Sequence, residues 1–127
     1  MLASVRVLLV DDDEHIREVT QLSLEATMGW EVVPVSSGPE ALNQLASDRF
    51  SVILLDVQMP GMDGPTTFGK IREIPSAVNV PVLLLTAKTQ RSDLITYEKA
   101  GVDGTIQKPF DPMTLGSQMA EMLGWPE

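Results

Sequence analysis

The chain has 127 residues, of which 43% are hydrophobic and 21% charged, and it contains no cysteine. This length is typical of one compact domain with its own core, and the lack of cysteine excludes disulfides, thiolate metal sites and a cysteine nucleophile. Eighteen acidic against nine basic residues give a formal net charge of −9, so we expect no direct nucleic-acid partner and no membrane partner. With no apolar run near the ~20 residues of a membrane span and no signal-peptide pattern, we expect a cytoplasmic protein.

Two strands and two helices are predicted in the first half of the chain. The apolar run 7–10 predicts a strand buried on both faces, and residues 31–36 predict a weaker one. Because Pro34 has no N–H to give to a strand ladder, the weaker strand belongs at a sheet edge. Ser37-Gly38-Pro39-Glu40 is a capping box with proline at the first helical position, and it predicts a helix start. In the helix between the two strands, the residues expected to face the core are Ile16, Val19 and Ala26.

The second half continues the alternation of strand and helix. Buried strands are predicted at 52–55 and 82–85, with a weaker one at 104–108. Asp111-Pro112 repeats the helix-start signal. The apolar residues that follow it at helical spacing are Leu115, Met119 and Met122. Five alternations indicate an α/β fold with helices on both faces, and right-handed crossovers favour a flavodoxin-like doubly wound parallel sheet of five strands in the order 2-1-3-4-5.

Acidic side chains follow the first and third predicted strands. In an open α/β sheet, ligands bind beyond the carboxyl ends of the strands, where the winding reverses. In the predicted order this point lies between the first and third strands, so we expect Asp11, Asp12 and Asp56 to converge. Close carboxylates repel one another unless a cation intervenes, and oxygen ligands without His or Cys suit Mg²⁺.

Two further polar residues, Thr86 and Lys108, end the fourth and fifth predicted strands. An ammonium group and a hydroxyl both suit phosphoryl oxygens, and phosphoryl transfer needs mainly positioning and charge neutralisation. The chain has no P-loop and no glycine-rich dinucleotide fingerprint, so a bound nucleotide is unsupported. What remains is a carboxylate that itself becomes the acceptor, as an aspartyl phosphate. Asp56, alone at the end of a central strand, is the natural choice.

Four motifs together resemble the receiver domain of two-component response regulators, which work in histidine-to-aspartate phosphorelays. They are Val10-Asp11-Asp12, the run LDVQMPGMDG at 55–64, Thr86-Ala87 and Lys108-Pro109-Phe110. The resemblance covers essentially the whole chain. It implies that residues 1–127 form a single receiver domain, with no output domain in this chain.

The resemblance also implies roles for the acidic residues. Asp56 is expected to be the phosphoacceptor, charged from a phosphohistidine on a sensor histidine kinase or a histidine phosphotransfer protein. Mg²⁺ is expected to be held by Asp12 directly, by Asp11 through water, by Asp56 and by the backbone carbonyl of Gln58.

Thr86 and Lys108 match the positions that contact the phosphoryl group, and the Lys108-Pro109 bond is cis in this family. Phosphorylation is expected to alter the face formed by residues 91–123, which would signal to an unidentified downstream protein. Autophosphorylation and autodephosphorylation are the only catalysis that the resemblance implies, so we expect no enzyme of separate substrates.

This sequence departs from the family's usual residues at one position near the site, and two others lie where the family itself varies. Thr105 stands three residues before Lys108, where the family usually has an aromatic residue that switches together with the active-site threonine. A threonine cannot move a ring, so an alternative ring at Tyr97 is a hypothesis. Gln58 and Lys88 lie where the family tunes the lifetime of the phosphoryl group.

Other interpretations use the same residues differently. Among the three acids after the first strand, Asp13 is the plain helix-start residue. A Mg²⁺-dependent aspartyl-phosphate phosphohydrolase generally has a two-residue-spaced Asp pair and a cap, whereas here Val57 and Gln58 follow Asp56. A flavin carrier of the same fold would need a phosphate-cradling loop after the first strand. A degenerate receiver would act by binding alone and form no phosphoryl adduct.

Overall fold

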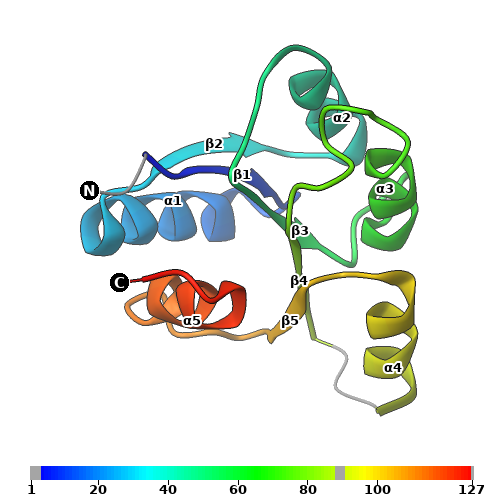
Figure 1. Ribbon diagram of the computed structural model, residues 1–127. Helices are drawn as coiled ribbons and strands as arrows, with labels where there is room; N and C mark the ends of the chain where they lie inside the picture. Colours follow the sequence, from blue (N-terminus) through cyan, green and yellow to red (C-terminus); the bar gives the residue numbers. More distant parts are fainter. Residues whose placement is uncertain (1–3, 88–90, 127) are drawn as a thin grey trace.

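The computed structural model describes residues 4–87 and 91–126. The chain alternates strands and helices around one parallel sheet, whose strands lie in the order β2-β1-β3-β4-β5 (Figure 1). The elements are β1 (Arg6–Val10), α1 (Glu14–Met28), β2 (Glu31–Val35), α2 (Gly38–Ser47), β3 (Val52–Asp56), α3 (Gly64–Ile71), β4 (Val82–Thr86), α4 (Arg91–Ala100), β5 (Gly104–Gln107) and α5 (Leu115–Leu123). The predicted fold class and strand order are therefore confirmed, with the proline-bearing β2 at an edge.

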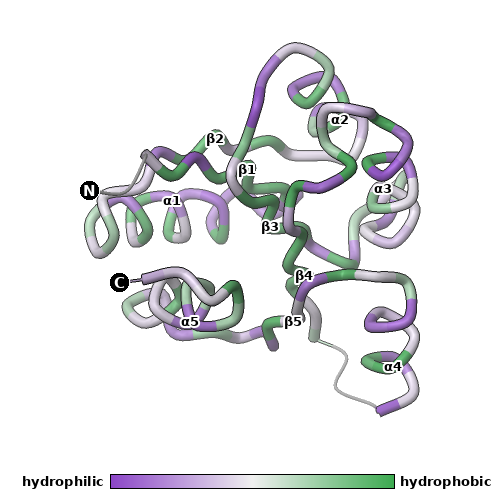
Figure 2. The backbone as a smooth tube through the Cα atoms, in the orientation of Figure 1, coloured by the Kyte–Doolittle hydropathy of each residue, from purple (hydrophilic) through white to green (hydrophobic). Residues whose placement is uncertain are grey.

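Helices cover both faces of the sheet, which explains why the central strands are apolar without alternation. Successive side chains of a strand point to opposite faces, so Val7 and Leu9 pack toward α1 and α5, whereas Leu8 and Val10 pack toward α2, α3 and α4. The hydrophobic stretches of the backbone accordingly concentrate on the central strands (Figure 2). Two core layers result, and the carboxyl ends of β1, β3 and β4 are held between them.

The inward face of α1 differs from the prediction. Thr20 and Leu24 are the buried residues of this helix, Ile16 and Val19 are half-buried, and Ala26 is exposed. Because two residues advance about 200° around a helix, Ala26 lies on the side opposite Leu24. The prediction was wrong for Ala26 because alanine is compatible with either face and Thr20 was not counted as a core residue.

The helix-start signals differ in their outcomes. The capping box is confirmed, because the Ser37 hydroxyl accepts the Glu40 amide at 3.3 Å and α2 begins at Gly38. The Asp111-Pro112 signal instead marks a turn: the Asp111 carboxylate accepts the Met113 amide at 2.9 Å, and α5 begins only at Leu115. Of the apolar residues at helical spacing that follow this signal, Leu115 and Met119 are buried, but Met122 is 39% exposed and lies outside the core.

Two glycines of α3 provide a matched test of how tightly this helix packs behind β3. A Cβ at Gly64 would lie 2.4 Å from the Asp56 carbonyl oxygen and 2.7 Å from Val57 Cα, both of them backbone atoms, whereas a Cβ at Gly69 would meet nothing within 4 Å. We expect Gly64→Ala to lower the free energy of unfolding by about 1–3 kcal/mol and Gly69→Ala to raise it by about 0.5–1 kcal/mol. Urea unfolding of both variants checks this, and equal effects would contradict the packing described.

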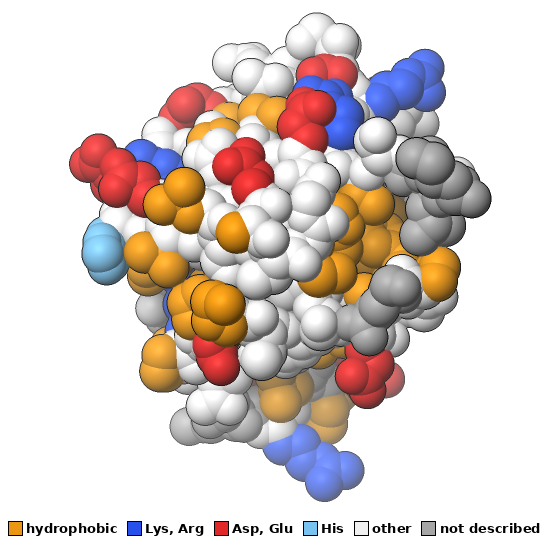
Figure 3. Space-filling model, turned by 90° about the vertical axis from the view of Figure 1, so that its left-hand side faces the viewer, with side chains coloured by type: hydrophobic (Ala, Val, Ile, Leu, Met, Phe, Trp, Pro, Cys, Tyr) orange, Lys and Arg blue, Asp and Glu red, His pale blue; other side chains and the backbone are white. Residues whose placement is uncertain are grey.

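The surface shows no concentration of charge on the face drawn in Figure 3, where acidic side chains are scattered among hydrophobic and basic ones. Across residues 4–87 and 91–126, no helix is both long enough and apolar enough to span a bilayer.

Candidate functional site

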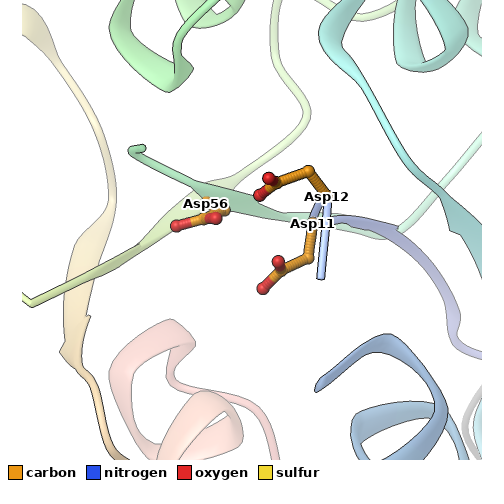
Figure 4. A group of neighbouring side chains, drawn as sticks. All are labelled: Asp11, Asp12 and Asp56. Atoms are coloured by element: carbon orange, nitrogen blue, oxygen red, sulfur yellow. The ribbon is translucent and has the colours of Figure 1, made fainter. Parts of the chain in front are cut away.

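Three carboxylates meet at the carboxyl edge of the sheet, as predicted. β1 and β3 are neighbours in register, with Val10 opposite Leu55, so the next residue of each strand brings Asp11 beside Asp56. Asp12 completes the group, and one carboxylate oxygen from each of the three lies within 4.8 Å of the others (Figure 4). They line a cavity of about 210 Å³ together with Asp13, Ile16, Gln58, Ala87 and Lys108.

The three acids differ in exposure. Asp11 is fully buried and Asp56 is 4% exposed, whereas Asp12 is open to solvent. The Asp11 side chain accepts the Asp13 amide at 2.9 Å, and Arg17 donates to the Asp11 carbonyl at 2.8 Å. The loop after β1 is thereby fixed from both sides. Arg17 was not predicted as a site residue. The signal for it is a basic residue one turn into the helix that follows an acidic loop.

Asp13 has the role expected of a helix-start residue. It is the N-cap of α1, and its carboxylate accepts the amides of His15 at 3.0 Å and Ile16 at 3.2 Å. This carboxylate also lies near the helix N-terminus, where the helix dipole favours negative charge. The side chains of Asp11 and Asp12 do not cap the helix, so their carboxylates are available to the acidic cavity.

Lys108 bridges two of the acids. Its Nζ lies 3.0 Å from Asp11 Oδ2 and 3.1 Å from Asp56 Oδ1. The Lys108 amide donates to the Thr86 carbonyl at 2.9 Å, which continues the pairing of β4 and β5 and carries the side chain to the acids. The Lys108-Pro109 bond is cis, in agreement with the resemblance. Burial opposes the charged ammonium, but hydrogen bonds and the charges of Asp11 and Asp56 outweigh it, so the pKa of Lys108 is raised.

The environment of Asp56 disfavours its charge. Burial, reinforced by the negative charge of Asp11, raises the pKa of Asp56 to about 6, although Lys108 and the Gln58 amide act in the opposite direction. Three carboxylates thus share one lysine, and the site has an excess of negative charge. Oxygen-only ligands at this spacing, with unbalanced charge, fit a hard divalent cation such as Mg²⁺.

The raised pKa of Asp56 predicts the effect of removing the charge at position 56 in the metal-free protein. Because the pKa of Asp56 is higher in the folded protein, about 6, than its ordinary 3.8, the folded state binds this proton more tightly, and the free energy of unfolding falls as pH rises through that interval. With EDTA present, Asp56→Asn should therefore melt higher than the wild type above pH ~6 and lose this advantage toward pH ~4.

Melting temperatures from pH 4.5 to 8 check this expectation, with Asp111→Asn, which replaces an exposed loop carboxylate, as the control. If the difference in melting temperature between Asp56→Asn and the wild type stays constant from pH 4.5 to 8, the raised pKa of Asp56 is contradicted.

The remaining predicted site residues lie around the three acids. Gln58 follows β3, lines the cavity, and its amide donates to Asp56 Oδ1 at 3.4 Å. Thr86 is the buried last residue of β4, the strand beside β3, although it is not among the described residues that line the cavity. Ala87 lines the cavity. Lys88 lies outside the described residues.

Comparison with known proteins agrees with this geometry. Residues 7–120 match the family of response regulator receiver domains. Over 123 residues, 97% of this chain, the sequence is 37% identical to the transcriptional regulatory protein CseB of Streptomyces coelicolor, and the chain spans 51% of that relative, about half its length. The structure of the Vibrio cholerae chemotaxis protein CheY4 superposes with a TM-score of 0.88 at 33% identity, covering 94% of this chain and 99% of that one.

A further structure bears on the acidic cavity. The receiver domain of the sensor histidine kinase PA1611 from Pseudomonas aeruginosa PAO1 was solved with a magnesium ion coordinated in its active site cleft. It superposes with a TM-score of 0.83 at 28% identity and covers 96% of this chain and 99% of its own. The fold, the acidic pocket with its lysine and the family match lead to one conclusion: this chain belongs to the response regulator receiver domains, the phosphoacceptors of two-component signalling.

Proposed function

We propose that Asp56 is the residue that takes the phosphoryl group, and that the donor is a phosphohistidine. In this reaction a carboxylate oxygen of Asp56 forms a bond to phosphorus while the bond from phosphorus to the imidazole nitrogen breaks and its electron pair returns to the imidazole. The observation that supports Asp56 is its position, buried at the end of a central strand, 3.1 Å from the Lys108 ammonium and beside two further carboxylates. Its near-complete burial limits the access of competing water.

The other site residues would hold the charges of the reaction. We assign Asp11, Asp12, Asp56 and the backbone carbonyl of Gln58 to Mg²⁺, which when bound neutralises charge on the phosphoryl oxygens. Lys108 would turn from the carboxylates to a phosphoryl oxygen, and the Thr86 hydroxyl, one strand away, would donate to another.

A groove beside the site supports a protein donor. About 530 Å³ in volume and largely apolar, it lies between α1 and the segment after β5, and it shares Ile16, Ala87 and Lys108 with the acidic cavity. A phosphohistidine must reach Asp56, so its protein has to cover this neighbouring surface. We therefore propose a sensor histidine kinase or a histidine phosphotransfer protein as the occupant.

Further parts of the proposal concern the rest of the signalling event. We propose that residues 1–127 act as a single receiver domain in the cytoplasm, and that the α4, β5 and α5 face conveys the phosphorylated state to a downstream protein. We also propose that no separate substrate is turned over, and that the chain catalyses only its own phosphorylation and dephosphorylation.

Phosphoramidate, a small compound with a phosphorus–nitrogen bond, tests the proposed donor chemistry without a partner protein. The wild type with Mg²⁺ should form one labile adduct by intact mass, Asp56→Asn none, and the Asp111→Asn control as much as the wild type. The same wild-type protein should leave p-nitrophenyl phosphate unchanged. An adduct of equal yield in Asp56→Asn, or steady turnover of the ester, would contradict the proposal.

A further inference from the structure

The loop that follows Asp56 has two sides. Toward the acids, Gln58 lines the cavity of about 210 Å³. On its other side the same residue lines a second cavity of about 460 Å³, together with Val57, Met59, Pro60, Asp63, Pro65 and Tyr97. Gln58 thus borders both the cavity at the proposed phosphorylation site and the cavity lined by the Tyr97 side chain of α4.

Tyr97 is the residue by which α4 is anchored. It is 8% exposed and is the buried residue of this helix, whereas Ile95 is 39% exposed and Leu94 is only partly buried. Its ring packs in the same core cluster as Val57 and Met59, which flank Gln58. An aromatic ring that is buried contributes a large apolar area, about 150–250 Å². The ring is therefore the main apolar group that joins α4 to the core cluster containing this loop.

The loop is tied to the site by its backbone. The Val57 amide donates to the Leu85 carbonyl at 2.9 Å, the Gly64 amide donates to the Val57 carbonyl at 2.9 Å, and the Gln58 amide reaches Asp56 Oδ1 at 3.4 Å. A group bound at Asp56 would compete for the Gln58 amide. Any movement of Gln58 would also displace its two neighbours in the chain, Val57 and Met59. Both neighbours belong to the same core cluster as the Tyr97 ring and line the cavity beside it.

The strand beside α4 offers no ring for this purpose. Thr105 lies opposite Leu84 in the β4–β5 register, and Leu84 belongs to the same core cluster as Tyr97. Thr105 is half-buried and small, whereas the Tyr97 ring is buried and lines the same cavity as Gln58.

We propose that Tyr97 is a positioning residue that links the phosphorylation site to α4: its ring supports the loop carrying Gln58, and a phosphoryl group on Asp56 shifts the loop, the ring and the helix together. This inference rests on the proposed function, because it takes Asp56 as the site of modification. The cavity of about 460 Å³ beside the ring gives it space to change position without unpacking the strands. The two arrangements would be populated according to the state of Asp56.

The chain has a single tyrosine, so labelling with 3-fluorotyrosine places one fluorine reporter on this ring. Adding Mg²⁺ and beryllofluoride, a phosphoryl mimic, should shift the fluorine resonance of the wild type and leave that of Asp56→Asn unchanged. A wild-type fluorine resonance that does not move, while backbone amides at 56–58 respond to the mimic, would overturn the inference and leave the proposed function standing. Absence of response at 56–58 as well would overturn both.

Side-chain replacement tests the link itself. In Tyr97→Leu the mimic should still shift the amides at 11–13 and 56–58, but the response of α4 amides should fall by roughly half or more, because the ring that conveys it is missing. Tyr97→Phe keeps the ring and should respond like the wild type. Leu94→Ala weakens the same helix without touching the ring, and should keep the α4 response.

Two results would contradict the inference in these variants. One is an α4 response in Tyr97→Leu equal to that of the wild type. The other is a loss in Leu94→Ala as large as in Tyr97→Leu, which would make Tyr97 a general anchor of the helix and not a link to the site.

Discussion

Lys108→Met is expected to lower the rate of phosphoryl-adduct formation by roughly 10²–10³-fold, the usual effect of removing one preorganised charge partner from a developing anion. Lys108 lies 3.1 Å from Asp56 Oδ1 and 3.0 Å from Asp11 Oδ2, and methionine keeps much of the side-chain length without the charge. The measurement is the rate of adduct formation with acetyl phosphate at saturating Mg²⁺. Lys70→Met, on the exposed side of α3, is the matched control and should react like the wild type.

The same variant should be less stable when metal is absent. Without Lys108, the fully buried Asp11 and nearly buried Asp56 face each other with no cation between them. Removing one partner from a buried ion pair typically costs about 3–5 kcal/mol, and we expect a loss in that range for the EDTA-treated protein, smaller when Mg²⁺ is added. An unchanged free energy of unfolding together with an unchanged reaction rate would show that the lysine bridge contributes to neither.

Mg²⁺ is expected to raise the melting temperature of the wild type in proportion to the logarithm of its concentration. A ligand that binds only the folded state stabilises it by about 2.7 kcal/mol at a hundredfold excess over its dissociation constant. Asp12→Asn should weaken this effect, shifting the apparent dissociation constant by roughly tenfold or more, because it removes a charged oxygen ligand.

The neighbouring residue supplies the control for this prediction. Asp13→Asn also removes one negative charge beside the cavity, but asparagine caps a helix about as well as aspartate, and Asp13 serves α1 as its cap. We expect it to keep nearly the whole Mg²⁺ effect. Equal weakening in both variants would mean that general negative potential, and not ligation by Asp12, accounts for the stabilisation.

Much of the fold could be predicted because its strands are buried on both faces. An unbroken apolar run such as residues 52–55 has few alternatives in a chain of this size, and Pro34 placed β2 at the edge because it lacks an N–H. The convergence of Asp11 and Asp56 followed from strand order alone, since neighbouring parallel strands end at the same edge.

Other features depend on packing that a local pattern does not encode. The signal at Asp111 is the same whether a carboxylate caps a helix or a turn, and here it caps a turn. The inward face of α1 is set by how the helix crosses the sheet, which buries Thr20 and leaves Ala26 exposed. The Lys108 bridge joins residues 97 positions apart. Its distances to Asp11 and Asp56 depend on how the side chains are placed, which the sequence does not give.

The burial of Tyr97 likewise could not be predicted from the sequence. Its position in the sequence suggested only that a ring was near the site, whereas the structure places the ring in the same core cluster as Val57 and Met59 and beside the cavity that they line. The loop that contains these two residues also carries Gln58, which lines both cavities.

The central claim, that Asp56 is phosphorylated in a Mg²⁺-dependent reaction, is tested most directly by intact mass after incubation with acetyl phosphate. We predict one labile phosphoryl adduct on the wild type with Mg²⁺, and none on Asp56→Asn or on the wild type in EDTA. The absence of any wild-type adduct, together with no response to beryllofluoride, would contradict the claim and indicate a receiver that signals by binding alone.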